Sequence, residues 1–137
     1  MESLLTPNIL AVIMARAGSV GLKNKHTLPL LGRPVISYTF DHAIASKLIT
    51  GWVVSSDSPE ILSLAADAGF HTIQRPAHLA TAEASVQSVL LHALNSIERD
   101  CGYVADAVVT LYGNVPIRGE GVIDRAIALL QQRRWHR

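Results

Sequence analysis

The sequence contains little cysteine, few aromatic residues and little charge, and these shortages exclude several classes of protein. Its single cysteine, Cys101, cannot form an internal disulfide framework and suits a reducing compartment. Charged residues make up only 17% of the 137 residues and the formal net charge is +1, so no overall charge draws the chain to nucleic acid. A hydrophobic content of 49% predicts a globular fold with a sizeable core.

Long hydrophobic runs are also missing. No apolar stretch approaches the ~20 residues of a transmembrane helix. Residues 1–8 do not combine a basic stretch with an apolar one, as a signal peptide does. We therefore expect a cytoplasmic protein with no membrane partner and no nucleic-acid partner, folded as a single domain over residues 1–137.

Short apolar runs alternate with segments of helical periodicity. The run Ile9–Met14 is typical of a strand buried on both faces, and further strands are predicted at Gly51–Ser56, Phe70–Ile73 and Ala105–Leu111. A helix is predicted after each strand. Four such units joined by right-handed crossovers indicate an α/β fold of the Rossmann-like type, with a mainly parallel sheet between two helical layers.

Each predicted helix carries an apolar stripe and recognisable ends. Ser58 is a predicted N-cap ahead of Pro59 and Glu60, and Gly69 is a predicted helix end. The stripes expected to be buried are Ile36, Phe40, Ala43 and Ile44; Ile61, Leu64, Ala65 and Ala68; Val86, Val89, Leu90, Ala93, Leu94 and Ile97; and, in the helix Val122–Gln132, Ile123, Ala126, Ile127 and Leu130.

A basic, glycine-containing segment follows the first strand, and it is the main candidate site. Its polar and glycine residues are Arg16, Gly18, Ser19, Gly21, Lys23, Asn24 and Lys25. Loops at the carboxyl ends of parallel strands bind phosphates, and this one is much longer than an ordinary turn of roughly 2–6 residues. It is neither a P-loop nor a dinucleotide fingerprint, because Leu22 stands where the P-loop requires glycine. A solvated basic turn is the alternative interpretation.

The same segment resembles a known family. The similar residues are A-R-A-G-S-V-G-L-K-N-K from Ala15, followed by L-P-L-L-G-R-P-V-I-S-Y-T. They are similar to the opening signature of the acylneuraminate (CMP-sialic acid) cytidylyltransferases, which are relatives of the CMP-Kdo synthetases. The similarity extends over about Ile9 to Leu130. It implies a nucleotidyltransferase fold with the first strand central and the strand Ala105–Leu111 on its other side.

The resemblance also implies an activity and roles for individual residues. CMP would pass from CTP to a nonulosonic acid such as N-acetylneuraminate, and pyrophosphate would leave. Arg16 and Lys23 match the catalytic, phosphate-gripping positions. The nucleotide-binding positions are Arg16, Gly18, Ser19, Gly21, Lys23, Asn24, Arg75 and Ser85, the last two in R-P-A-H-L-A and A-E-A-S beside the cytosine and ribose. The positions on the sugar side are Tyr112 and Arg118.

Simpler roles remain open for several of these residues. Arg75 fits a solvated loop arginine equally well, and Ser85 fits a helix N-cap, a role compatible with ligand contact. Asp57 fits a residue that fixes the loop after the second strand. The six histidines lack the spacing of a metal site, so surface or packing roles are expected for them.

The sequence departs from the family pattern in its length and at Val20, Tyr112 and Ala82, the last standing where the family has an aspartate. Val20 stands where the family has Lys, and Tyr112 stands where it has Gln near the acceptor sugar, which leaves the sugar unidentified. The family's magnesium-binding aspartates and dimerisation segment lie beyond Arg137, so the resemblance implies Mg²⁺ but supplies no ligand here. We expect a domain truncated at its C-terminus. The alternatives are a catalytically incomplete nucleotide-binding module and a half-enzyme completed by another chain, and a homodimer is possible.

Overall fold

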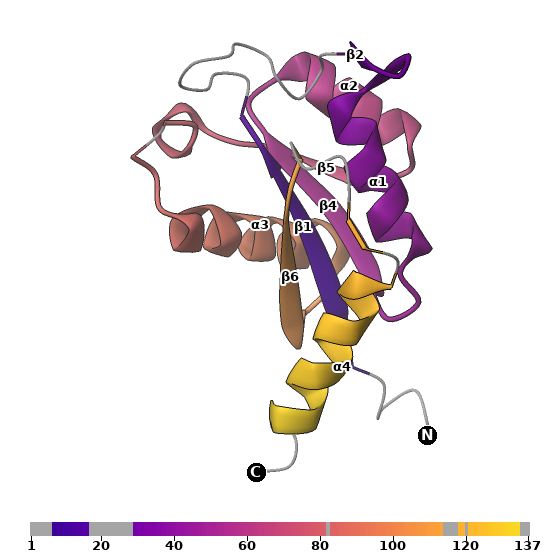
Figure 1. Ribbon diagram of the computed structural model, residues 1–137. Helices are drawn as coiled ribbons and strands as arrows, with labels where there is room; N and C mark the ends of the chain where they lie inside the picture. The colour runs from indigo at the N-terminus through magenta and orange to yellow at the C-terminus, as the bar shows by residue number, and fades with distance from the viewer. Residues whose placement is uncertain (1–6, 17–28, 82, 114–117, 120, 135–137) are drawn as a thin grey trace.

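The computed structural model describes residues 7–16, 29–81, 83–113, 118–119 and 121–134, with side chains through residue 130. Figure 1 shows an α/β arrangement whose sheet is crossed by helices on both sides. The elements are β1 (Ile9–Ala15), β2 (Pro29–Leu30), β3 (Arg33–Pro34), α1 (Val35–Ala45), β4 (Gly51–Ser56), α2 (Pro59–Asp67), β5 (His71–Gln74), a 3₁₀ turn (Ala77–Leu79), α3 (Val86–Cys101), β6 (Ala107–Tyr112) and α4 (Val122–Arg134).

The main sheet has the strand order β5-β4-β1-β6, and all of its pairings are parallel. Val12 of β1 lies opposite Val53 of β4 on one side and opposite Thr110 of β6 on the other. The parallel sheet and the central position of the first strand are therefore confirmed. Because the carboxyl ends of parallel strands share one edge, this order brings the segments after β1, β4, β5 and β6 to the same edge.

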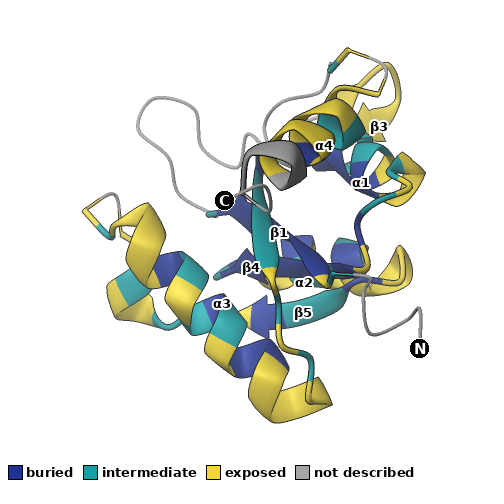
Figure 2. Ribbon diagram, turned by 90° about the horizontal axis from the view of Figure 1, so that it is seen from below, coloured by how far each residue is buried: buried dark blue, intermediate teal, exposed yellow. Residues whose placement is uncertain are grey.

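Strand β1 forms the centre of two hydrophobic cores. All seven of its residues are buried, with at most 9% of any residue exposed. Successive side chains of a strand point to opposite faces. Ile9, Ala11 and Ile13 accordingly pack with α1, α2 and α4, whereas Leu10 and Val12 pack with α3. The buried residues in Figure 2 follow this layering. The uninterrupted apolar run in the sequence thus has a direct cause, because neither face of β1 meets water.

Local sequence signals set the helix ends. The Ser58 hydroxyl accepts a hydrogen bond from the Ile61 amide at 3.3 Å, which confirms the predicted N-cap of α2. Helix α3 ends at Cys101, and Gly102 follows it with a left-handed φ of 70°. None of the described helices is both long enough and apolar enough to cross a bilayer.

Some residues of the predicted apolar stripes are exposed, because their helices extend past the layer that covers them. Ile44, Val86 and Leu130 are 53%, 41% and 43% exposed. Val86 lies in the first turn of α3, and Leu130 lies almost one turn beyond the buried Ile127 of α4. Ala68 is also exposed. Periodicity identifies the inward face of a helix, but not how far the neighbouring layer reaches.

A short hairpin was not predicted. β2 pairs with β3 in antiparallel fashion, and the connecting Leu31 and Gly32 both have positive φ, at 53° and 84°. This is the geometry of a two-residue primed turn, which suits the twist of a hairpin. The hairpin is fastened to α1, because Arg33 lies 2.8 Å from the Asp41 carboxylate and 4.6 Å above the centre of the Tyr38 ring.

Helix α4 is anchored by its first turn. The Asp124 carboxylate accepts hydrogen bonds from the Ser46 hydroxyl and from the backbone amides of Lys47 and Leu48, the amide bonds measuring 2.9 and 3.3 Å. Burial raises the pKa of this carboxyl, but the three hydrogen bonds outweigh burial and hold the pKa below its ordinary value. Asp124 therefore fastens α4 to the loop between α1 and β4.

Replacing the Ser58 cap should destabilise the fold measurably. We expect Ser58→Ala to lower the free energy of unfolding by about 1 kcal/mol, because the Ile61 amide loses its acceptor. Ser63→Ala is the matched control, since Ser63 is an exposed residue within the same helix and alanine favours helix. Urea unfolding monitored by circular dichroism measures both variants. Equal effects of the two changes would contradict the capping role.

Asp124→Asn should remove a pH-dependent part of the stability. With its pKa lowered in the folded state, Asp124 contributes fully above the unfolded-state value of about 4, and that contribution is lost as the pH falls through the lower folded-state pKa. Urea unfolding at pH 7 and pH 3 checks this. The variant should be less stable than the wild type at pH 7, and the gap should narrow at pH 3. A stability difference between variant and wild type that is equal at both pH values would contradict the anchoring role.

Candidate functional site

Three charged residues lie side by side at the carboxyl edge of the sheet. The last register pairs join Ala15 to Ser56 and Ser56 to Gln74, so the three strands stop at the same level. The next residue of each strand is charged, and across the sheet the order is Arg75, Asp57, Arg16. The fold thus gathers residues that are 59 positions apart (75 − 16) in the sequence.

Arg75 is the most unusual of these residues because its charge is buried. Only 4% of the residue is exposed. Its Nε donates to the Ser55 hydroxyl at 3.2 Å, one terminal nitrogen donates to the Ser55 carbonyl at 2.9 Å, and the other lies 3.5 Å from the Leu79 carbonyl. The solvated-loop interpretation of Arg75 is therefore wrong, and the side chain fixes the segment after β5 against β4.

The electrostatics of this row favour an anion. Burial lowers the pKa of Arg75, the nearby charge of Arg16 lowers it further, and the carboxylate of Asp57 raises it. Two guanidinium groups therefore share the edge with one carboxylate. Guanidinium groups match the oxygen geometry of phosphates and carboxylates, and partial burial strengthens that attraction. The row can accordingly hold a negatively charged ligand next to the end of β1.

A second cluster surrounds Arg118, which fastens the segment before α4 to α1. One terminal nitrogen of Arg118 donates to Thr39 Oγ1 at 3.1 Å and to His42 Nδ1 at 2.7 Å, and the other donates to the Tyr112 carbonyl at 3.0 Å. Tyr112 is the last residue of β6, where it lies opposite Met14, and it is 50% exposed. The structure thus brings the two predicted sugar-side residues, Tyr112 and Arg118, into direct contact.

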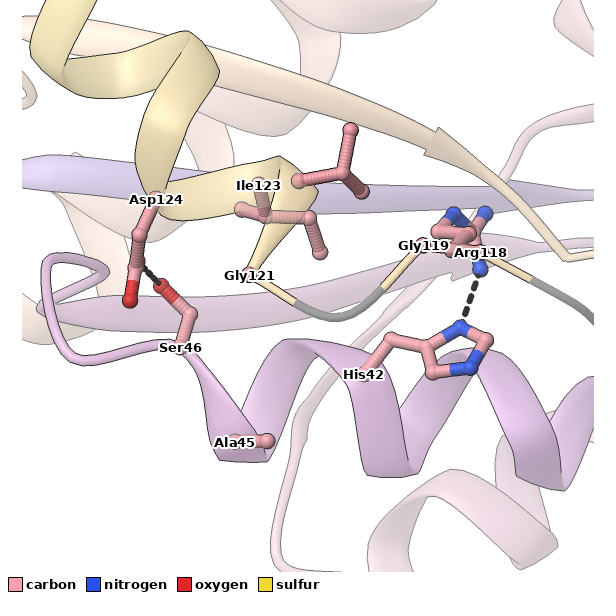
Figure 3. A pocket seen from close by; sticks show the side chains of 9 residues that line it. His42, Ala45, Ser46, Arg118, Gly119, Gly121, Ile123 and Asp124 are labelled. Atoms are coloured by element: carbon pink, nitrogen blue, oxygen red, sulfur yellow. Dashed lines mark hydrogen bonds between the residues drawn. The ribbon is translucent and has the colours of Figure 1, made fainter.

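The Arg118 cluster lines one end of a cavity between α1 and α4. The cavity has a volume of about 190 Å³ and is lined by His42, Ala45, Ser46, Arg118, Gly119, Gly121, Val122, Ile123 and Asp124. Figure 3 shows Arg118 turned toward His42 at one end and Asp124 bonded to Ser46 at the other. This cavity lies on the flank of α1, and Arg118 links it to the carboxyl end of β6.

The other predicted site residues fall into two groups. Gly18, Ser19, Gly21, Lys23 and Asn24 lie outside the described residues. Ser85 is the N-cap of α3, as expected, because its hydroxyl accepts from the Ser88 amide at 3.0 Å. Asp57, expected to fix its loop, lies between the two arginines of the edge.

Sequence reasoning missed the residues that hold Arg75 and Arg118. Ser55 supports Arg75 from 20 positions away, and Thr39 and His42 support Arg118 from 79 and 76 positions away. No short-range spacing connects such residues. A buried serine in β4 or a histidine in α1 carries no signal until the fold places an arginine beside it.

The described residues do not form a metal site. No group of three His, Cys, Asp or Glu side chains within the described ranges could hold a metal ion. The Mg²⁺ that the resemblance implies therefore finds no fitting ligand set among the described residues.

Comparisons with known proteins identify relatives of this chain. The N-acylneuraminate cytidylyltransferase of Escherichia coli O18:K1:H7 is 35% identical over 123 residues, which are 90% of this chain and 28% of that protein. The pseudaminic acid cytidylyltransferase of Campylobacter jejuni is 30% identical over 118 residues, covering 85% of this chain and 50% of that protein. The chain thus spans half or less of the length of these relatives.

The fold has a solved counterpart as well. The structure of CMP:2-keto-3-deoxy-manno-octonic acid synthetase complexed with CTP superposes with a TM-score of 0.76 at 22% identity, covering 91% of this chain and 48% of that one. At that identity the likeness concerns the fold. A family model described as Cytidylyltransferase matches residues 10–136. With nearly its whole sequence matched, the chain belongs to the cytidylyltransferase family.

Proposed function

We propose that this chain forms the nucleotide-binding part of a cytidylyltransferase that transfers CMP from CTP to a nonulosonic acid. The observation that carries the proposal is the row of Arg75, Asp57 and Arg16 at the end of the central strands. The buried guanidinium of Arg75 and the half-buried one of Arg16, with the Asp57 carboxylate between them, give a net positive field at the edge where parallel sheets bind nucleotides. Membership of the family supports CTP as the nucleotide.

The proposed reaction needs positive charge at a defined place. The anomeric hydroxyl of the sugar acid attacks the α-phosphorus of CTP in line and loses its proton to water, and the bond between that phosphorus and the oxygen of the leaving pyrophosphate breaks. Negative charge grows on the pyrophosphate during this step. Arg16 and Lys23 are proposed to stabilise that charge. Preorganised cations act most strongly on charge that develops only in the transition state.

The remaining residues divide between the two substrates. We assign the nucleotide to the loop residues Gly18, Ser19, Gly21 and Asn24, with Arg75 and Ser85 on the cytosine and ribose side. Tyr112 and Arg118 are assigned to the sugar acid. Their support is the position of Tyr112 at the carboxyl end of β6, one strand away from Arg16, and its hydrogen bond with Arg118.

Nucleotide titration tests the proposed site directly. Calorimetric titration of the protein with CTP, then with ATP, GTP and UTP, each with magnesium present, should give binding of CTP in preference to the others. A pyrophosphate-release assay with CTP and N-acetylneuraminate then tests turnover. Selective CTP binding without pyrophosphate release would support a nucleotide-binding module and contradict the enzyme. Absence of binding for every nucleotide would contradict the site itself.

Arg16→Gln should weaken CTP binding without unfolding the protein. Arg16 is half-buried at the sheet edge, and losing a charged hydrogen bond to a phosphate costs about 1.5–3 kcal/mol, a decrease in affinity of tenfold or more. Arg99→Gln is the matched control, because Arg99 is an exposed arginine in the last turn of α3. Calorimetry measures both variants. Equal affinities for the two variants would contradict the assignment of Arg16.

A further inference from the structure

The Arg118 side chain is held by groups from two different elements. Thr39 and His42 lie one turn apart on α1, and both accept hydrogen bonds from the same terminal nitrogen of Arg118. The other terminal nitrogen donates to the Tyr112 carbonyl at the end of β6. Thr39 is fully buried, and its hydroxyl also lies 3.4 Å from that carbonyl. Helix α1, Arg118 and the end of β6 therefore form one connected network.

This network requires His42 to be neutral. The guanidinium of arginine has N–H groups only and remains charged throughout the working pH range, so it donates in every contact. His42 Nδ1, 2.7 Å away, must therefore be the unprotonated nitrogen, with the hydrogen on Nε2. Protonation would place an N–H and a positive charge against the guanidinium. The close contact would then be lost.

The charges around His42 favour the neutral form. Burial lowers the pKa of His42, the charge of Arg118 lowers it further, and Asp41 on the same helix raises it. Asp41 is itself paired with Arg33 of the hairpin. Asp124, on the opposite wall of the cavity, already accepts three hydrogen bonds from the loop that follows α1. At neutral pH the His42 ring is uncharged and available as an acceptor.

We propose that His42 is a positioning residue that holds Arg118 against the Tyr112 carbonyl and releases it when the imidazole is protonated. The effect of this release on ligand binding rests on the proposed function, in which Tyr112 and Arg118 contact the sugar acid. Affinity for a sugar carboxylic acid then falls as the pH drops through the His42 pKa, which burial and the charge of Arg118 hold below its ordinary value. The nucleotide-binding edge around Arg16 and Arg75 does not share this dependence, because His42 is bonded to neither residue in the contacts described.

The contact itself can be tested without any substrate. Nuclear magnetic resonance on labelled protein reports the tautomer of His42 and the rotation of the Arg118 guanidinium. We expect the Nε2–H tautomer and a restrained guanidinium at pH 7.5, and a faster-rotating guanidinium below the His42 titration midpoint. His42→Asn places an amide oxygen near the position of Nδ1, so Arg118 should stay restrained at every pH.

Two further variants complete the test. His42→Leu, which offers no acceptor, should let the Arg118 guanidinium rotate faster at every pH, and thermal unfolding shows whether this variant remains folded. His71→Asn is the matched control on β5 and should behave like the wild type. If Arg118 titrates in His42→Asn as it does in the wild type, or if His42 carries its hydrogen on Nδ1, the proposal is wrong.

Ligand binding tests the consequence separately. With CTP and magnesium present, the affinity for N-acetylneuraminate should fall about tenfold in the wild type between pH 7.5 and a pH below the His42 titration midpoint, the loss expected for one charged hydrogen bond. It should change little in His42→Asn. Failure of CTP and sugar to bind at any pH would overturn the proposed function, while the resonance measurements would still decide the role of His42. Equal pH dependence in both proteins would overturn the positioning role.

Discussion

The structure depends on the burial of β1 between two strands and two helical layers. Its seven residues have no solvated face, and both of its backbone edges are paired, with β4 on one side and β6 on the other. Parallel strands joined by helical crossovers lead to this arrangement, because each crossover covers a face of the sheet. The two hydrophobic cores on either side of β1 hold the ends of neighbouring strands in register, and the charged row at the carboxyl edge follows from that register.

At the carboxyl edge of the sheet, the rigid strand framework holds the positive charge of Arg75 in a buried position, which is unfavourable by itself. Arg75 is buried, and its hydrogen bonds go to a hydroxyl and carbonyl groups. The carboxylate of Asp57 raises its pKa, while the charge of Arg16 lowers it. Hydrogen bonds to neutral groups offset only part of the desolvation of a charged group. An anion bound at this edge would add to the attraction that the Asp57 carboxylate already supplies. The strand framework keeps the guanidinium in place beforehand, so little reorganisation accompanies binding.

The sequence was sufficient for the fold class and for the identity of most elements, but not for the contacts between distant residues. The continuous apolar run of β1 and the cap at Ser58 are local signals, and the structure agrees with both. The hairpin at Leu31 and Gly32 escaped prediction because strands of two residues have no periodicity. The support of Arg118 by His42 escaped prediction for another reason, since only tertiary packing brings residues 76 positions apart together. Residues 17–28, which carry most of the basic, glycine-containing part of the resemblance, lie outside the described residues.

The strand order has a further consequence for how the chain folds during synthesis. β1 emerges first, yet β6, its second neighbour, comes about a hundred residues later, and Asn8 beside β1 bonds with Asp106, 98 positions away. Closing so long a loop carries an entropic cost and slows folding. Until β6 is made, one edge of an uninterrupted apolar strand has no native partner, which is the kind of exposed segment that chaperones protect. The strand that organises the folded protein is thus also the most vulnerable part of the nascent one.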